Sequence, residues 1–561
     1  MIQQWLRVPV AVRGRVEALL AVGFLMGLGA FGQAHAAGES TASDIGESIY
    51  RRGVLASGAP LVGSRRAGSP DLTGAGAACV NCHRRSGLGG REGTMTIPPL
   101  TSEYLFRDRG TAAHETMLHG YGNQLSHRDA YTDASLAHAI RDGVDSMGRT
   151  LSPLMPRFAL DDAGMEALIG YLKKLGTRRM PGVTASVLHL ATVVTPGADP
   201  LKRQGTLEVL KRYFIEKNAV PFGHAEPPSA AGRAHTASIP PGLRHWQLHV
   251  WELSGPESGW REQLDRDLAR EPVMALLSGV GGSKWGPVHE FCEKAELPCL
   301  FPNLDVPTVA EGDFYSLYYS NGVLLEAQLI ARQVAAAPKA GVNRKLLQIY
   351  RAGDSGEAAA NALTAALQGK QLEVRSKALP AGRAESGLRN ALRAAASADL
   401  LVLWLRPEDI AQLGTAPQNL PVYLSGLMGG LEQAPLPASW RAQTKMTYPV
   451  DLPERRVVRV DYGLGWFTFR HIPVVAMQAQ SDTYLACGIL TETLEHASDI
   501  SDPTYLVELL QETLDHRVLT GYYPRLTLAA GQTLASKGSY LVRFAEPSGP
   551  RLVVEGEWTV P

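Results

Sequence analysis

The stretch Cys79-Val80-Asn81-Cys82-His83 decides how the amino-terminal part of this chain is interpreted. Two thiols three positions apart, followed at once by an imidazole, form the C-x-x-C-H signature of covalent haem attachment. The spacing has a chemical reason, because the two sulfurs reach two carbons of one porphyrin and the histidine is then carried to the iron. We therefore expect one haem c, bonded to Cys79 and Cys82, with His83 as an axial ligand of the iron.

Two other chemistries use a C-x-x-C pair, and the flanking residues disfavour both. A structural zinc site needs a second ligand pair at finger spacing, yet the next cysteine is Cys292. A thioredoxin-like dithiol needs a strand before the motif and a helix after it. Instead, residues 74–78 are rich in glycine and alanine, and residues 84–90 are rich in glycine.

The amino terminus has the composition of an export signal. Three arginines precede an apolar run over residues 18–31, and small residues surround a cleavage point at 34–36. We expect residues 1–36 to be a signal peptide and the mature chain to be periplasmic, with no membrane span after cleavage. The alternative is an uncleaved anchor, although the apolar run is shorter than a spanning helix requires.

Length, composition and charge narrow the class of protein. The 561 residues are 45% apolar, which predicts two or three domains with their own cores. The chain carries 55 basic and 55 acidic side chains, a balance that favours neither a nucleic-acid-binding nor an anionic-membrane surface. The sequence shows no motif for a hydrolytic triad, a nucleotide loop or a metal-binding helix. We therefore expect an electron carrier and not an enzyme.

Residues 43–176 place the haem motif between two expected helices. The first covers residues 44–50, with Gly46 and Tyr50 on one face. The second begins at Asp161-Asp162 and ends near Gly176. Its apolar stripe comprises Met165, Leu168, Ile169 and Leu172. In this order the segment resembles the monohaem class I cytochromes c, an all-α domain in which the two helices cross at a small residue.

Two further segments match that family. Pro98, in Pro98-Pro99-Leu100, matches the proline whose carbonyl accepts a hydrogen bond from the axial histidine. Met155, in a loop with prolines on both sides, matches the distal thioether ligand. The resemblance implies that His83 and Met155 are the axial pair of the iron.

Other distal arrangements stay open. Met147 is a second thioether, and an open site is a further alternative. Residues 101–133 are longer than the family requires, and their histidines are His114, His119 and His127. Arg84, Arg85 and Arg91 follow the motif, either as a basic rim that steers an acidic redox partner or as ordinary solvated charges.

After a linker over residues 177–186, strands and helices alternate to the end of the chain. Such alternation predicts parallel sheets with helices on both faces, and a region of this length suits two lobes with a cleft. The expected strands cover residues 188–194, 246–253, 273–277, 346–350, 400–405 and 422–424.

The order of elements in residues 187–561 resembles the type I periplasmic solute-binding proteins, in particular the branched-chain amino-acid class. The better local matches are residues 314–320 and the closing stretch 556–561. The resemblance implies a small solute held by loops that follow strands. Ser283 lies in one such loop, where the alternative role is a helix cap. Asp305 lies in a second, as a ligand contact or a turn cap.

Cys292 and Cys299 lie seven residues apart, at the expected end of a helix and start of a strand. They form either a disulfide, as an oxidising compartment allows, or two buried free thiols.

The whole sequence thus predicts an all-α cytochrome c domain followed by an α/β two-lobed periplasmic-binding-protein-like domain. We expect single-electron transfer to a redox partner protein in the periplasm, with a domain that binds a solute or docks a partner. Two alternatives remain. One is an importer or sensor binding protein with a haem-containing accessory domain, and the other is the cytochrome subunit of a periplasmic dehydrogenase.

Overall fold

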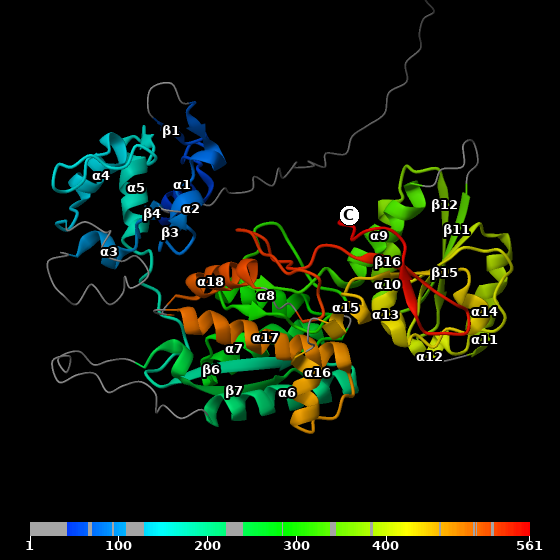
Figure 1. Cartoon of the computed structure of the whole chain (residues 1–561). Coiled ribbons are helices and arrows are strands. Elements are labelled where there is room, and N and C mark those ends of the chain that lie inside the picture. The colour runs from blue at the N-terminus through cyan, green and yellow to red at the C-terminus, as the bar shows by residue number, and fades with distance from the viewer. Residues whose placement is uncertain are drawn as a thin grey trace, which may run out of the picture. The chain divides into compact units, whose positions relative to one another are not determined.

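The structure is a computed structural model, in which the elements of residues 42–561 fall into three groups (Figure 1). We call residues 42–175 the helical module. The first lobe comprises residues 187–318 with 477–517, and the second lobe comprises residues 322–448 with 539–561. The structure describes residues 42–65, 70–92, 95–107, 128–219, 239–282, 284–336, 344–381, 385–458, 462–497, 500, 502–517 and 521–561.

The helical module encloses its own apolar cluster, which includes Ile49, Leu136 and Leu168. Its helices are α1 (Ala42–Arg52), α2 (Val80–His83), α3 (Ser102–Phe106), α4 (Asp133–Asp142) and α5 (Asp162–Leu172), and a 3-10 turn, η1 (Gly74–Ala77), precedes α2. Its short strands are β1 (Val62–Ser64), β2 (Leu72–Thr73), β3 (Gly90–Glu92), β4 (Met95–Ile97) and β5 (Arg157–Phe158).

Helices α1 and α5 cross at Gly46, where the sequence predicted a crossing. A Cβ atom at this glycine would lie 2.2 Å from the carbonyl oxygen of Ala167, so any larger residue would push the helices apart. Beside the crossing, the rings of Tyr50 and Tyr171 lie 5.3 Å apart between their centroids. Asp161 caps α5 by accepting a hydrogen bond from the backbone of Gly164, which also matches the prediction.

A small antiparallel sheet, in the order β2-β1-β5, joins segments that are far apart in the sequence. Gly63 of β1 pairs with Leu72 on one side and with Phe158 on the other. Strand β2 leads through η1 to Cys79, and Met155 lies just before β5. The sheet therefore ties the loop of Met155 and the approach to the motif to the two edges of the same strand, β1.

The first lobe is built on a parallel sheet in the order β10-β9-β8-β6-β7. Its strands are β6 (Val187–Val194), β7 (His245–Glu252), β8 (Ala275–Leu277), β9 (Cys299–Leu300) and β10 (Ser316–Leu317). Its helices are α6 (Pro200–Ala219), α7 (Trp260–Arg270), α8 (Gly286–Ala295), α17 (Met477–His496) and α18 (Pro503–His516). Separate apolar clusters line the two faces of this sheet, as parallel sheets require.

The second lobe is built on a sheet in the order β12-β11-β13-β14-β15-β16-β17, parallel up to β15 and antiparallel beyond it. Its strands are β11 (Arg344–Arg351), β12 (Leu372–Leu379), β13 (Leu400–Trp404), β14 (Val422–Leu424), β15 (Thr444–Tyr448), β16 (Tyr540–Phe544) and β17 (Leu552–Val554). Its helices are α9 (Gly322–Ala336), α10 (Ser355–Ala366), α11 (Glu385–Arg393), α12 (Pro407–Ile410), α13 (Gly426–Gly429) and α14 (Ala438–Arg441). Two helices follow β15 before α17, namely α15 (Pro453–Val458) and α16 (Tyr462–Phe469).

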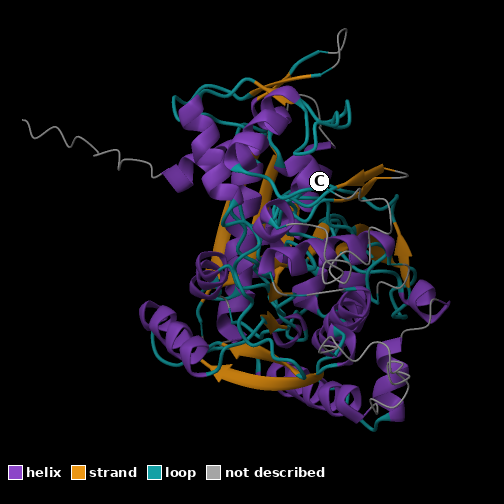
Figure 2. Ribbon diagram, turned by 90° about the vertical axis from the view of Figure 1, so that its left-hand side faces the viewer, coloured by secondary structure: helices purple, strands orange, loops and turns teal. Residues whose placement is uncertain are grey.

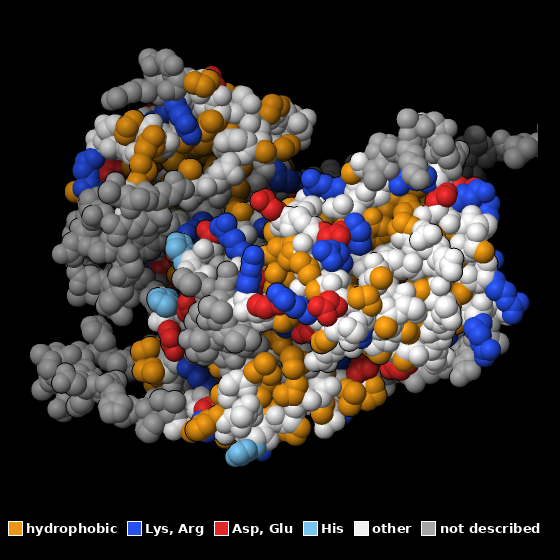
Figure 3. All heavy atoms as spheres, turned by 45° about the vertical axis from the view of Figure 1, so that its right-hand side comes forward, with side chains coloured by type: hydrophobic (Ala, Val, Ile, Leu, Met, Phe, Trp, Pro, Cys, Tyr) orange, Lys and Arg blue, Asp and Glu red, His pale blue; other side chains and the backbone are white. Residues whose placement is uncertain are grey.

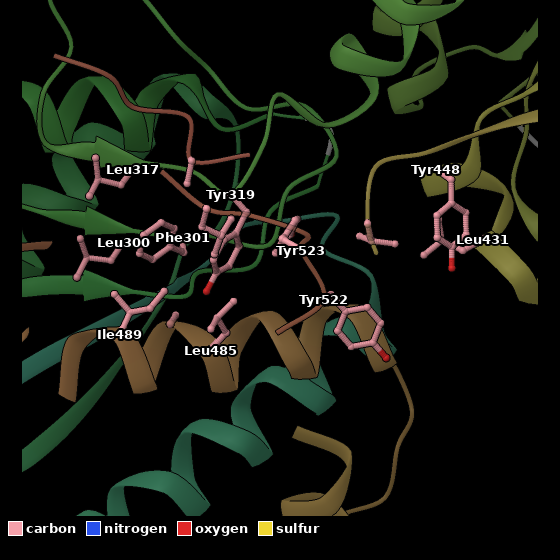
Figure 4. Close-up of a cluster of buried hydrophobic side chains, with 14 of the residues drawn as sticks. Leu300, Phe301, Leu317, Tyr319, Leu431, Tyr448, Leu485, Ile489, Tyr522 and Tyr523 are labelled. Carbon is pink, nitrogen blue, oxygen red and sulfur yellow. The ribbon is translucent and has the colours of Figure 1, made fainter. Parts of the chain in front are cut away.

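The chain passes between the lobes after β10, after β15 and before β16. Buried side chains fill this region continuously. Figure 4 shows them running from Leu300 and Ile489 in the first lobe, through Tyr319 and Tyr523, to Tyr448 in the second. The ring of Tyr319 stacks between Phe301 and Tyr523, with centroids 4.5 and 5.1 Å away. The lobes therefore share one apolar cluster across the crossing segments.

The alternating strands and helices predicted from the sequence are present, and helices pack around the strands (Figure 2). Strands β12 and β15 were not predicted. β12 is an edge strand whose apolar–polar alternation is limited to residues 372–375, and β15 is rich in threonine, so neither has a long apolar pattern. In the part of the chain that the structure describes, no helix is long and apolar enough to cross a membrane. The expected signal peptide lies outside the described residues.

Candidate functional site

His83 ends α2 with its Nδ1 atom 2.9 Å from the carbonyl oxygen of Pro98. The β3–β4 hairpin makes this contact, because it turns the chain back on itself between the two residues. Gly89 sits at the base of the hairpin with a φ of +68°, and a Cβ there would lie 2.2 Å from the carbonyl oxygen of Ile97. A carbonyl can only accept, so Nδ1 carries the proton and Nε2 keeps the lone pair that a metal uses.

The thiols and the imidazole lie on one helical turn. Cys79 is the residue before α2, and the backbone N–H of His83 donates to its carbonyl at 2.9 Å. Neither Cys79 nor Cys82 takes part in a disulfide within the described residues, and the first is half-buried and the second exposed. Burial lowers the pKa of His83 to about 4, so the ring is neutral near pH 7. Covalent attachment of a haem requires two thiols that bond the porphyrin and a neutral imidazole whose Nε2 can bind the iron, and these three groups are present here.

Met155 is half-buried and packs against the apolar cluster of the module. Its loop is held in place because Arg157 Nη1 donates to the carbonyl oxygen of Met155 at 2.5 Å. Met147, the other thioether considered, is 51% exposed in a turn. His114, His119 and His127 lie outside the described residues. Met155 is thus the better buried of the two methionines considered as the distal ligand.

Arg84 and Arg85 contact the first lobe and do not form the open basic rim that the sequence allowed. Arg84 pairs with Glu512 of α18, with Nη1 and Oε2 3.2 Å apart. The guanidinium of Arg85 lies over the ring of Phe314, 4.3 Å from its centroid. The side chain of Arg91 lies outside the described part of the structure.

Each lobe has a topological switch point at the first strand of its parallel sheet. The second strand of the sheet pairs with one side of that first strand, and the third strand pairs with the other side. Ligands of such sheets bind at this point, outside the carboxyl ends of the strands. In the first lobe the loop after β6 leads to Lys202 in the first turn of α6. In the second lobe the loop after β11 leads to Asp354, the N-cap of α10, and Arg406 follows β13.

A cluster of charged side chains connects these two switch points. Asp305 accepts from Lys202 Nζ at 2.8 Å and from Arg406 Nη2 at 2.6 Å. Arg406 also bonds both oxygens of Asp354, at 2.7 and 2.9 Å. The hydroxyl of Ser355 donates to Asp305 at 3.1 Å. We call Lys202, Asp305, Asp354 and Arg406 the interlobe cluster.

Asp305 is committed to this cluster. Its burial opposes ionisation, but Lys202 and Arg406 outweigh that effect and hold the pKa of Asp305 well below its usual range. Its carbonyl oxygen also accepts from the backbone N–H of Val323 at 2.9 Å, at the start of α9. Asp305, predicted as a solute contact or a turn cap, thus forms ion pairs with residues of both lobes, and its contact with a solute stays a prediction.

Ser283, the other predicted solute contact, lies outside the described residues. Its alternative role as the cap of the following helix is wrong, because α8 begins at Gly286 and its N-cap is Trp285.

A buried polar network adjoins the interlobe cluster in the first lobe. Asn303 donates from Nδ2 to the hydroxyls of Ser278 and Thr483, both at 3.1 Å. These hydroxyls lie 2.8 Å from each other. Asp482, the neighbour of Thr483 on α17, accepts from the hydroxyl of Tyr523 at 3.2 Å, and burial raises its pKa to about 7. This network was not predicted, because its members come from elements far apart in the chain.

Cys292 and Cys299 form a disulfide with their Cα atoms 6.1 Å apart. The bond joins α8 to β9, so the disulfide, the first of the two alternatives for this pair, is the one present.

On the face of the molecule that Figure 3 shows, basic and acidic side chains lie next to one another, in keeping with the balanced charge of the sequence.

No protein-family model and no curated protein matches this sequence. Solved structures are similar to it. An ABC transporter substrate-binding protein from Aeropyrum pernix is 14% identical, with 67% of this chain and 96% of that one covered and a TM-score of 0.47. One from Sphaerobacter thermophilus is 15% identical, with 67% and 98% covered and a TM-score of 0.47. A leucine-binding protein from Thermotoga maritima is 12% identical, with 66% and 98% covered and a TM-score of 0.44. The two-lobed α/β fold is assigned to this chain from the strand pairings within its own two large sheets.

Proposed function

We propose that this chain is an exported c-type cytochrome that carries one covalent haem for single-electron transfer and is fused to a two-lobed solute-binding domain. The hydrogen bond between His83 Nδ1 and the Pro98 carbonyl carries the proposal. It orients an imidazole directly after two thiols on one turn and leaves Nε2 for the iron.

Each residue of this site has a separate role. Cys79 and Cys82 would hold the haem through thioether bonds, and His83 and Met155 would be its axial ligands. Burial of His83 keeps water away from that side of the site. A haem with both axial positions filled exchanges single electrons without binding a substrate at the iron. This arrangement favours an electron carrier that serves a redox partner protein in the periplasm.

The mass and absorption spectrum of the exported, purified protein test the haem proposal. We expect the intact mass to exceed that of the mature chain by one haem, which denaturation does not release. The double variant Cys79→Ala, Cys82→Ala should lose it, whereas Cys487→Ala, at a buried cysteine of α17, should keep it. A protein exported without haem, or with zinc in its place, would contradict the proposal.

We also propose that a small solute binds between the lobes at the interlobe cluster. The support is geometric, because the cluster joins the switch points of both parallel sheets. It offers two cations and two carboxylates, which favours solutes with a carboxylate, an ammonium group or both.

Thermal unfolding with a panel of amino acids and short carboxylic acids tests this second proposal. A solute at about a hundred times its Kd should stabilise the protein by about 2.7 kcal/mol. The same solute should stabilise the Lys202→Met variant less, whereas Lys294→Met, at an exposed residue of α8, should respond as the wild type does. Haem loading without any solute effect, together with copurification of a dehydrogenase, would instead favour a docking subunit.

A further inference from the structure

The segment that follows His83 is seated on a buried carboxylate of the first lobe. The backbone N–H groups of Arg85 and Ser86 donate to Oε1 of Glu508 at 2.7 and 3.0 Å. The hydroxyl of Ser86 donates to Oε2 at 2.5 Å. Glu508 lies on α18 and is only 7% exposed. Arg85 and Ser86 belong to the loop that follows the C-x-x-C-H motif, which we call the motif loop. They therefore donate hydrogen bonds to both oxygens of a buried carboxylate.

The surface that receives this loop is itself held in place. Arg85 stacks on Phe314 and also lies 5.5 Å from the ring centroid of Tyr315. The hydroxyl of Tyr315 lies 3.0 Å from Oγ1 of Thr504, one turn before Glu508 on α18. Glu293 of α8 accepts hydrogen bonds from the backbone N–H groups of both aromatic residues. Helices α8 and α18 thus fix the aromatic contact from two sides.

The chain that leaves the module is tied to the same lobe. Arg178 forms an ion pair with Glu296 and donates to the carbonyl oxygen of Ala295 at 2.8 Å. Gly182 has a φ of +68°, and a Cβ there would lie 2.5 Å from the Cα atom of Val273. The linker expected over residues 177–186 therefore lies against the first lobe instead of spanning a gap.

We propose that Glu508 locks the helical module to the first lobe, so that the two form one rigid body. All the contacts given above reach the first lobe, and a buried carboxylate is stable only while donors satisfy it. Burial raises the pKa of Glu508, and its bonds to the motif loop oppose that shift. The lock requires neither solute nor haem.

Hydrogen exchange of the full-length protein, read at the amides of Arg85 and Ser86, tests the lock. Glu508→Ala removes the acceptor of both amides, and their exchange should become about tenfold faster or more, given the strength of hydrogen bonds to a charged group. Glu512→Ala is the matched control on the same helix, since it removes only the exposed pair with Arg84. It should change exchange at these amides by about twofold or less. Equal, small changes in both variants would overturn the lock.

Ser86→Ala provides a milder variant should Glu508→Ala fail to fold, because it removes one hydroxyl donor and leaves the carboxylate in place. Exchange at the Arg85 amide should rise in this variant as well, and wild-type exchange there would count against the lock.

Unfolding in urea supplies an independent readout. Apart from Trp5, every tryptophan of the chain lies in residues 187–561, so tryptophan fluorescence follows the lobes alone. Exchange at α5 follows the module. The two transitions should coincide in the wild type and separate in Glu508→Ala, and separate transitions in the wild type would overturn the proposal. If the purified protein carries no haem but the amides of Arg85 and Ser86 are protected from exchange, the haem proposal is refuted and the lock is supported.

Discussion

Asp482 is a carboxylate buried in the first lobe, and Glu326 is one buried in the second. In both, the rise in pKa caused by desolvation exceeds the decrease caused by hydrogen bonds. Asp482 accepts from the side chains of Gln478 and Tyr523. Glu326 accepts from the Thr447 hydroxyl at 2.7 Å and from the backbone N–H of Gly426 at 2.9 Å, among others. Burial raises the pKa of each to about 7. Each carboxyl is therefore largely protonated in the folded protein at mildly acidic pH.

This shift predicts a stability that falls as the pH rises. An unfolded aspartate has a pKa of about 3.9, so between about pH 4 and pH 7 the folded state binds more protons than the unfolded one. Asp482→Asn should reduce the slope of unfolding free energy against pH by up to about 1.4 kcal/mol per pH unit in that range. Urea unfolding at several pH values measures the slope. Near pH 4, where Asp482 is neutral, wild type and variant should agree, and parallel curves throughout would contradict the prediction.

Met155 allows a test at a single side chain. Loss of a thioether ligand removes the weak far-red absorption band of ferric haem with a histidine and a methionine ligand. We expect Met155→Ala to lose this band while the haem stays covalently attached. The exposed Met147 provides the control, since Met147→Ala should keep the band. A wild-type protein without the band would indicate a histidine or an open distal position.

At the scale of the elements, periodic apolar residues predicted what the structure contains. Strand β6 appears within a residue of its expected bounds, and α5 begins where expected but ends at Leu172, four residues before Gly176. Both were predictable because each buries a regular apolar stripe. The β3–β4 hairpin lay beyond this reasoning, since its strands are too short to show a period. That hairpin brings the carbonyl of Pro98 to Nδ1 of His83. The resemblance to cytochromes c predicted this contact, whereas the periodicity of apolar residues could not.

The crossing of α1 and α5 predicts opposite outcomes for two glycines. Gly46→Ala forces a methyl group into the carbonyl of Ala167 and should lower the unfolding free energy of the module by about 1–3 kcal/mol. Gly170 lies within α5, and a Cβ there meets no atom within 4 Å. Gly170→Ala should therefore stabilise the module by about 0.5–1 kcal/mol through helix propensity. Thermal unfolding of both variants measures the pair, and destabilisation by both would contradict the packing argument.

At the scale of the whole molecule, the interlobe cluster shows why the candidate site was only partly predictable. Asp305 was singled out by the resemblance to solute-binding proteins, because it lies in a loop that corresponds to one of their ligand-binding loops. Its partners Lys202 and Arg406 were not, because they lie 103 and 101 residues away and meet it only once both sheets have formed. Glu508 escaped for the same reason, as the charge pattern of α18 is that of an ordinary amphipathic helix.

The cluster predicts a loss of stability in acid. A depressed pKa contributes stability that is present above the unfolded value of about 4 and is lost as the pH falls through the folded value. Asp305→Asn should lower the unfolding free energy by about 1–3 kcal/mol near pH 7 and flatten its decline below about pH 4. Urea unfolding followed by tryptophan fluorescence measures both effects. The control, Asp265→Asn at an exposed pair on α7, should cost about 0.5 kcal/mol or less.

Ser86 and Glu508 are separated by 422 residues in the chain. In a polypeptide that is delivered amino terminus first, the motif emerges long before the helix that will cover the loop behind it. Cys79 and Cys82 are therefore synthesised well before the loop behind them can be covered. On the proposed function, this order along the chain places attachment of the prosthetic group ahead of the closure of the module onto the first lobe.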